Sequence, residues 1–90
     1  MPRFCRAGDV EIGPSRPLAV IAGPCVLESL QLGLDIGHAL RDACDAAGLS
    51  YIFKASFDKA NRSSISSARG PGLEQGLEWM ARIGRELDRP

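Results

Sequence analysis

The sequence of 90 residues predicts an α/β fold with parallel strands, of which it supplies only the opening part. Short apolar runs alternate with segments of helical periodicity, an order typical of parallel strands joined by right-handed crossovers. Two such β/α units follow a predicted hairpin, and two parallel strands with two helices do not close a core. A complete β/α barrel takes roughly 250 residues, so we expect a third strand directly beyond Pro90.

Composition argues against several classes of protein. The 11 basic and 11 acidic residues give a formal net charge of zero, whereas binding to nucleic acid or to a membrane surface favours a basic field. The longest apolar run, residues 17–25, is too short to span a bilayer, and no apolar signal segment follows the first arginines. The three cysteines form no CxxC pair, so we expect a reducing, cytoplasmic compartment.

The chain divides into a hairpin at residues 1–16 and two β/α units at residues 17–90. In the hairpin, residues 4–6 and 10–12 flank a turn that contains Gly8. Residues 18–22 are continuously apolar, which predicts a strand that is buried on both faces. Gly23 and Pro24 end this strand.

The first helix is predicted to begin after Ser29 as N-cap and to end at Gly48 as the C′ residue. Gly33 and Gly37 should each weaken it by up to about 1 kcal/mol relative to alanine, and close packing is the one explanation that we find for them. We expect Cys44 in the core. The predicted apolar face comprises Leu32, Ile36, Ala39, Leu40, Ala43 and Ala47.

A second strand is predicted at residues 51–53, where aromatic and β-branched residues adjoin. A polar segment, residues 54–69, separates it from a second helix. Pro71 suits the first helical position of that helix, and Glu74 suits its first turn. Its predicted buried stripe comprises Leu73, Leu77, Met80 and Leu87.

The polar segment follows the carboxyl end of a strand, where barrels and open α/β sheets bind ligands. Its cationic, hydroxyl and amide side chains suit the oxygens of phosphates and carboxylates. A solvated surface loop would have the same composition, so residue types alone leave both readings open. The side chains are Lys54, Ser56, Lys59, Asn61, Arg62, Ser63, Ser64 and Arg69.

Cys25 follows the first long strand, so its Cα should lie at the same edge as Lys54. A thiolate at this position could bind a metal or act as a nucleophile. A buried cysteine that serves only as a small apolar side chain is the alternative.

Two segments carry a resemblance to a known family. They are Ile21–Ser29, which reads IAGPCVLES, and Phe53–Ser64, which reads FKASFDKANRSS and is followed by RGPGLE at residues 69–74. The chain resembles the 3-deoxy-8-phosphooctulonate synthases, also named 2-dehydro-3-deoxyphosphooctonate aldolases. The related 3-deoxy-7-phosphoheptulonate synthases share the barrel and chemistry but diverge in the second segment. The chain departs from the resembled pattern at Ser66 and Ala68, where histidine and tyrosine are usual.

The resemblance implies the N-terminal portion of a (β/α)₈ TIM barrel, usually a homotetramer. It also implies condensation of phosphoenolpyruvate with D-arabinose 5-phosphate, with release of phosphate, in the lipopolysaccharide Kdo pathway. Lys54 and Ser56 would hold phosphoenolpyruvate, and Lys59 would act between the two substrates as the catalytic residue. Asn61, Arg62 and Ser63 would hold arabinose 5-phosphate.

The resemblance further implies a metal. Members with cysteine at the position of Cys25 use a divalent cation, and zinc, iron, manganese and cobalt are not distinguished here. The remaining ligands, a histidine, a glutamate and an aspartate, would lie in later strands. The metal would orient or polarise the sugar aldehyde. The 90-residue chain alone is therefore predicted to be inactive. The alternatives are a non-catalytic remnant of the enzyme and a related 3-deoxy-7-phosphoheptulonate synthase.

Overall fold

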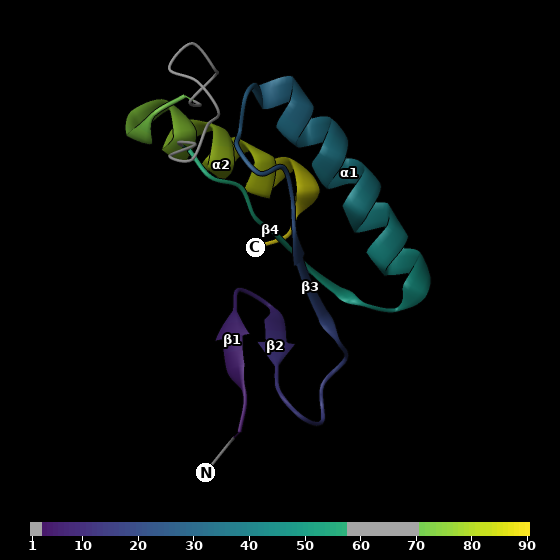
Figure 1. Cartoon of the computed structure of the whole chain (residues 1–90). Helices are drawn as coiled ribbons and strands as arrows, with labels where there is room; N and C mark the ends of the chain where they lie inside the picture. Colours follow the sequence, from purple (N-terminus) through teal and green to yellow (C-terminus); the bar gives the residue numbers. More distant parts are fainter. Residues whose placement is uncertain (1–2, 58–70) are drawn as a thin grey trace.

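The computed structural model describes residues 3–57 and 71–90 (Figure 1). The elements occur in the predicted order, hairpin, strand, helix, strand, helix. Their bounds are β1 Cys5–Ala7, β2 Val10–Ile12, β3 Ala19–Ala22, α1 Leu30–Ala47, β4 Ser50–Phe53 and α2 Leu73–Leu87. The described residues form two separate two-stranded sheets and no closed barrel. Neither of their helices is long and apolar enough to cross a membrane.

The hairpin and the parallel pair follow the sequence pattern. β1 and β2 are antiparallel, with Cys5 opposite Ile12. β3 and β4 are parallel and in register from Ala19 opposite Ser50 to Ala22 opposite Phe53. The hairpin contacts both parallel strands at the end where they begin (Figure 1). The hairpin therefore does not cover the other end of the pair, where both strands end and the segments that carry the family resemblance continue.

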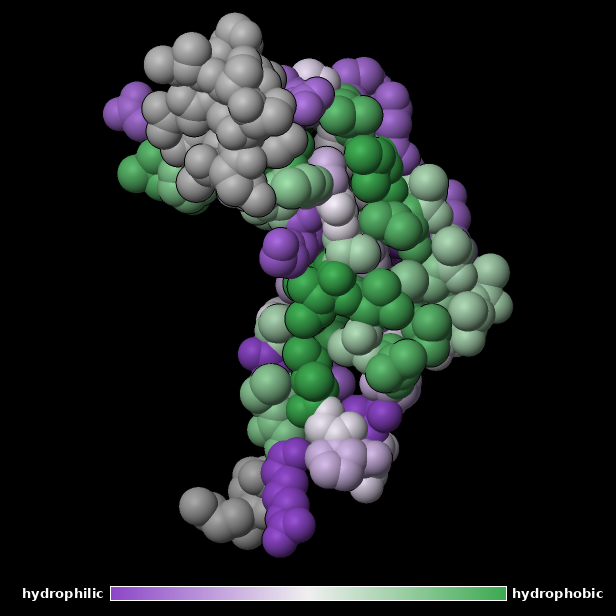
Figure 2. Space-filling view, viewed as in Figure 1, coloured by the Kyte–Doolittle hydropathy of each residue, from purple (hydrophilic) through white to green (hydrophobic). Residues whose placement is uncertain are grey.

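The hydrophobic core covers only one face of the β3–β4 pair. Tyr51 and Phe53 point into it from β4, and Val20 and Ala22 pack against it from β3. The prediction that residues 18–22 are buried on both faces is wrong for this chain, because both helices pack on the same face. Ile21 remains 55% exposed and Leu18 69%. In Figure 2, hydrophobic side chains run along the middle of the molecule, where Figure 1 draws β3.

The predicted caps of α1 are confirmed. The hydroxyl oxygen of Ser29 accepts a hydrogen bond from the Leu32 N–H at 3.0 Å, which satisfies one of the free donors of the first turn. Gly48 adopts a left-handed conformation with φ of 72°, and its N–H donates to carbonyls in the last turn. Glycine reaches this conformation without a steric penalty.

The face of α1 that packs against the core differs from the predicted one. Its buried residues are Gly33, Leu34, Gly37 and Cys44, whereas Leu32 is 37% exposed and Ala39, Ala43 and Ala47 are also exposed. The glycines cause the difference. A Cβ atom on Gly33 would lie 2.6 Å from Leu27 Cδ1 and 2.8 Å from Ile83 Cδ1, and one on Gly37 would lie 2.7 Å from Leu87 Cδ1. Close packing therefore explains both residues, as expected.

α2 also departs from the sequence interpretation. It begins at Leu73 with Gly72 as N-cap, so Pro71 precedes the cap and is not the first helical residue. Leu73 is 57% exposed and Leu77 61%, which contradicts the first half of the predicted stripe. Its second half is confirmed, since Leu87 is fully buried and Met80 packs against the core. The buried residues are Gly76, Ile83 and Leu87, because α2 packs the side with Gly76 against Phe57. Glu74 lies in the first turn as predicted.

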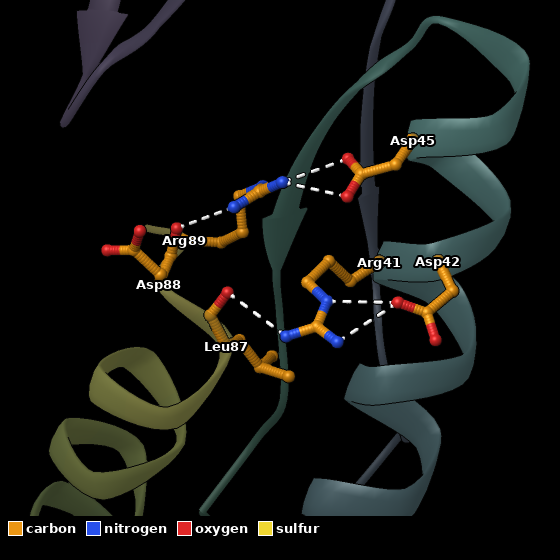
Figure 3. Close-up of polar contacts among 6 residues, drawn as sticks. All are labelled: Arg41, Asp42, Asp45, Leu87, Asp88 and Arg89. Atoms are coloured by element: carbon orange, nitrogen blue, oxygen red, sulfur yellow. Dashed lines mark hydrogen bonds and ion pairs between the residues drawn. The ribbon is translucent and has the colours of Figure 1, made fainter.

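Two arginines join the ends of α1 and α2 (Figure 3). Arg41 donates to the Leu87 carbonyl at 3.5 Å. Arg89 Nη2 lies 2.9 Å from both carboxylate oxygens of Asp45. The second contact is half exposed, so its contribution to stability is small, and burial of the apolar side chains is the main stabilising term.

We predict that Gly33→Ala destabilises the fold. The new Cβ would press on the Cδ1 methyl groups of Leu27 and Ile83, which are 1% and 0% exposed, so that they can move only by displacing other core atoms. Overpacking of this kind typically costs about 1–3 kcal/mol. Urea unfolding, followed by the fluorescence of the single tryptophan, Trp79, measures the change.

Gly84→Ala is the matched control, because a Cβ there meets only the Arg89 carbonyl oxygen at an ordinary 3.5 Å. Helix propensity should raise its free energy of unfolding by up to about 1 kcal/mol. If both variants were stabilised equally, the close contact at Gly33 would be refuted.

Tyr51 supplies a pH test of the core. Its hydroxyl donates to the Ala22 carbonyl at 2.8 Å, and burial, helped by the nearby Cys44, raises the pKa of Tyr51 to about 12. A raised pKa means that the folded state keeps the neutral phenol while the unfolded state ionises near pH 10. The stabilisation is therefore complete below about pH 10 and is lost as the pH rises toward 12.

Tyr51 is the only tyrosine, so phenolate absorbance reports it alone. We expect a titration midpoint near 12 in buffer and near 10 in concentrated urea. A midpoint near 10 under both conditions would contradict the buried phenol.

Candidate functional site

The carboxyl ends of β3 and β4 meet at one edge of the molecule. Because the strands are parallel and in register, the residue groups that follow them emerge side by side. Cys25 follows β3, and Lys54 and Ser56 follow β4. The Lys54 N–H donates to the Ala22 carbonyl at 3.1 Å, and the Ser56 N–H donates to the Cys25 carbonyl at 3.3 Å. The predicted juxtaposition of Cys25 and Lys54 is confirmed at the level of the backbone.

The pairing continues past the regular strands with one extra residue on the β3 side. Val26 bridges Ser56 in parallel, so three residues separate Ala22 from Val26 while two separate Phe53 from Ser56. This irregularity is a bulge at Gly23, Pro24 and Cys25. Bulges interrupt a ladder locally and re-aim the neighbouring side chains, and they are common beside functional sites.

The side chains at this edge are accessible to a ligand. Cys25 and Lys54 are exposed, and Ser56 is half-buried. The thiol of Cys25 is a soft metal ligand, but a metal of this kind needs about four ligands. The described parts of the chain contain no group of three or more histidine, cysteine, aspartate or glutamate side chains that could hold a metal. They therefore do not form a metal site by themselves.

The remaining predicted site residues, Lys59, Asn61, Arg62 and Ser63, lie outside the described residues. The residues on either side of their segment are joined. The Gly72 N–H donates to the Phe57 carbonyl at 3.1 Å, and the side chain of Phe57 packs so closely on Gly76 that a Cβ there would lie 2.7 Å away. Phe57 and Gly72, which flank the segment, therefore lie next to each other in the fold. The sequence analysis did not predict these contacts of Phe57, although Gly72 and Gly76, the two residues that Phe57 contacts, are both glycines.

A cavity of about 330 Å³ lies elsewhere, where β4 begins. Its lining includes Asp9, Asp45, Tyr51 and Arg89. The guanidinium of Arg89 is already paired with Asp45. The cavity also lies at the first residues of β4, whereas Lys54 follows the last residue of that strand. This cavity is therefore not the candidate site.

Comparison with known proteins decides the family. The family model described as the DAHP synthetase I family matches residues 4–90. The chain belongs to this family. Among similar curated proteins, 2-dehydro-3-deoxyphosphooctonate aldolase from Desulfotalea psychrophila is 54% identical over 91% of the chain. The proteins of the same name from Paracidovorax citrulli and Fusobacterium nucleatum are 55% and 46% identical over 89% and 94% of it.

These relatives confirm the resemblance drawn from the two sequence segments. The chain nevertheless spans only 28–31% of the length of the three relatives.

Proposed function

We propose that this chain forms part of a 3-deoxy-8-phosphooctulonate synthase, which condenses phosphoenolpyruvate with D-arabinose 5-phosphate and releases phosphate. The observation that carries the proposal is the single edge at which the two resemblance segments meet. Val26 and Ser56, one from each segment, form a backbone bridge there. Ligand sites of β/α proteins lie at this end of the strands.

The family resemblance assigns each residue a role in this reaction, and the charges of the substrates support these roles. Both substrates are anionic, so their approach requires fixed cations that offset the repulsion and orient them. Lys54 and Ser56 would bind phosphoenolpyruvate, and Lys59 would act between the two substrates. Asn61, Arg62 and Ser63 would bind arabinose 5-phosphate, because guanidinium and hydroxyl groups pair well with phosphate oxygens.

The exposed apolar face of the β3–β4 pair supports a (β/α)₈ barrel as the complete fold. Ile21 on β3 is 55% exposed, and both faces of the strands in such a barrel are normally covered. The outer edge of β4, the one that does not face β3, already forms a backbone hydrogen bond: the Phe53 N–H donates to the Pro90 carbonyl at 2.9 Å. The division at residue 16, the homotetramer, the cytoplasmic location and the lipopolysaccharide Kdo pathway remain predictions.

Cys25 would be one ligand of a divalent metal, with the histidine, glutamate and aspartate ligands supplied by later strands. The metal would contribute Lewis-acid or orienting chemistry toward the sugar aldehyde. The exposure of the Cys25 thiol is compatible with this role.

A chimera tests the proposal. In the Desulfotalea psychrophila relative, the segment that aligns with this chain over 82 residues is replaced by the aligned residues of this chain. We expect phosphate release that requires both phosphoenolpyruvate and arabinose 5-phosphate. Because an eight-carbon product needs a five-carbon sugar, turnover that instead requires a four-carbon aldose phosphate would indicate a 3-deoxy-7-phosphoheptulonate synthase. A folded chimera without turnover would favour the non-catalytic remnant.

Two substitutions in the chimera test the residue roles. Arg62→Ala should raise the KM for arabinose 5-phosphate by roughly tenfold or more, since a charge-assisted contact contributes about 1.5–3 kcal/mol. Lys54→Ala should instead raise the KM for phosphoenolpyruvate. Equal effects of Arg62→Ala on both KM values would contradict the assignment, and Arg85→Ala, an exposed arginine of α2, is the control.

A further inference from the structure

We propose that Gly23 is a positioning residue, which holds the Lys54 peptide, and with it the phosphoenolpyruvate-binding side chains, in place against β3. This inference rests on the proposed function, because it concerns the same site. Gly23 has no side chain, and it is not among the residues assigned above to substrate or metal binding.

The evidence is a backbone contact that only glycine permits. A Cβ atom on Gly23 would overlap the carbonyl oxygen of Lys54, and it would lie 2.9 Å from the Lys54 carbonyl carbon and 3.2 Å from its nitrogen. Backbone atoms cannot rotate away as the end of a side chain can. Any other residue at position 23 must therefore displace the Lys54 peptide or the β3 end.

The contact lies inside the bulge, between two sets of pairing. On one side the Lys54 N–H bonds to the Ala22 carbonyl, and on the other the Ser56 N–H bonds to the Cys25 carbonyl. The Leu27 N–H closes the set by donating to the Ser56 carbonyl at 2.8 Å. The Lys54 peptide is thus held by hydrogen bonds along the ladder and by Gly23 across its face. Displacing it would move Lys54 and Ser56 relative to Cys25.

A displacement of the Lys54 peptide should affect catalysis more than folding. A misplacement of about 1 Å at a reacting centre can lower the rate by roughly 100-fold. The Lys54 side chain is exposed and lies past the end of β4, so it adds nothing to the hydrophobic core itself, although its neighbours Phe53 and Ala55 contact that core. We therefore expect a substitution of Gly23 to impair the kinetic constants more than the stability of the fold.

The test uses the chimera described above with Gly23→Ala, and Gly13→Ala is its matched control. Gly13 is also crowded by backbone, though less than Gly23, since a Cβ there would lie 2.7 Å from the Arg3 carbonyl oxygen and 2.6 Å from Phe4 Cβ. It adjoins the hairpin, away from Lys54. We expect Gly23→Ala to lower kcat/KM for phosphoenolpyruvate by roughly 100-fold, mainly through KM. Gly13→Ala should lower the melting temperature and leave both kinetic constants unchanged.

The outcomes separate the two proposals. An inactive parent chimera would count against the proposed function. An active parent in which Gly23→Ala and Gly13→Ala behave alike would overturn the positioning role alone. If Gly23→Ala does not fold, Pro24→Ala decides, because it adds no side-chain atom; it frees the fixed φ of the bulge and introduces one backbone N–H. We then expect a several-fold rise in the KM for phosphoenolpyruvate, and an unchanged KM would overturn the inference.

Discussion

The parallel, in-register pairing of β3 and β4 is the constraint on which the rest of the structure depends. Because both strands run in one direction, their carboxyl ends share an edge, and the segments after them meet there. Antiparallel pairing of the same strands would place Cys25 and Lys54 at opposite ends of the molecule. The crossover through α1 is what allows the parallel arrangement, and its packing on the strands is therefore part of the site's architecture.

Glycines connect this packing to the site. Gly33 and Gly37 let α1 approach Leu27, Ile83 and Leu87, so side chains from other elements fix the helix together with its own buried side chains. Gly76 gives Phe57 the same close approach to α2. At the strand ends, Gly23 brings the two backbones together. In each case the missing side chain is what sets the distance between elements.

The sequence predicted the elements well and their faces poorly. Ser29 and Gly48 marked the ends of α1 because capping is local chemistry between neighbouring residues. The buried faces of the helices were mispredicted in part, because apolar periodicity counts Leu73 and Leu77 but not glycines. Which face packs also depends on neighbours that are distant in sequence. Strand direction followed from the alternating order of strands and helices, so the meeting of Cys25 and Lys54 was predictable. The bulge was not, since a register shift needs both strands to be seen together.

The most direct test of the central claim is a crystal structure of the chimera with bound phosphoenolpyruvate. The account predicts that oxygen atoms of the ligand lie within hydrogen-bonding distance of the Lys54 ammonium and of Ser56, at the edge that also carries the Cys25 sulfur. Phosphoenolpyruvate bound beside the hairpin, where the strands begin, or a Cys25 sulfur at the other end of the strands from Lys54, would contradict it.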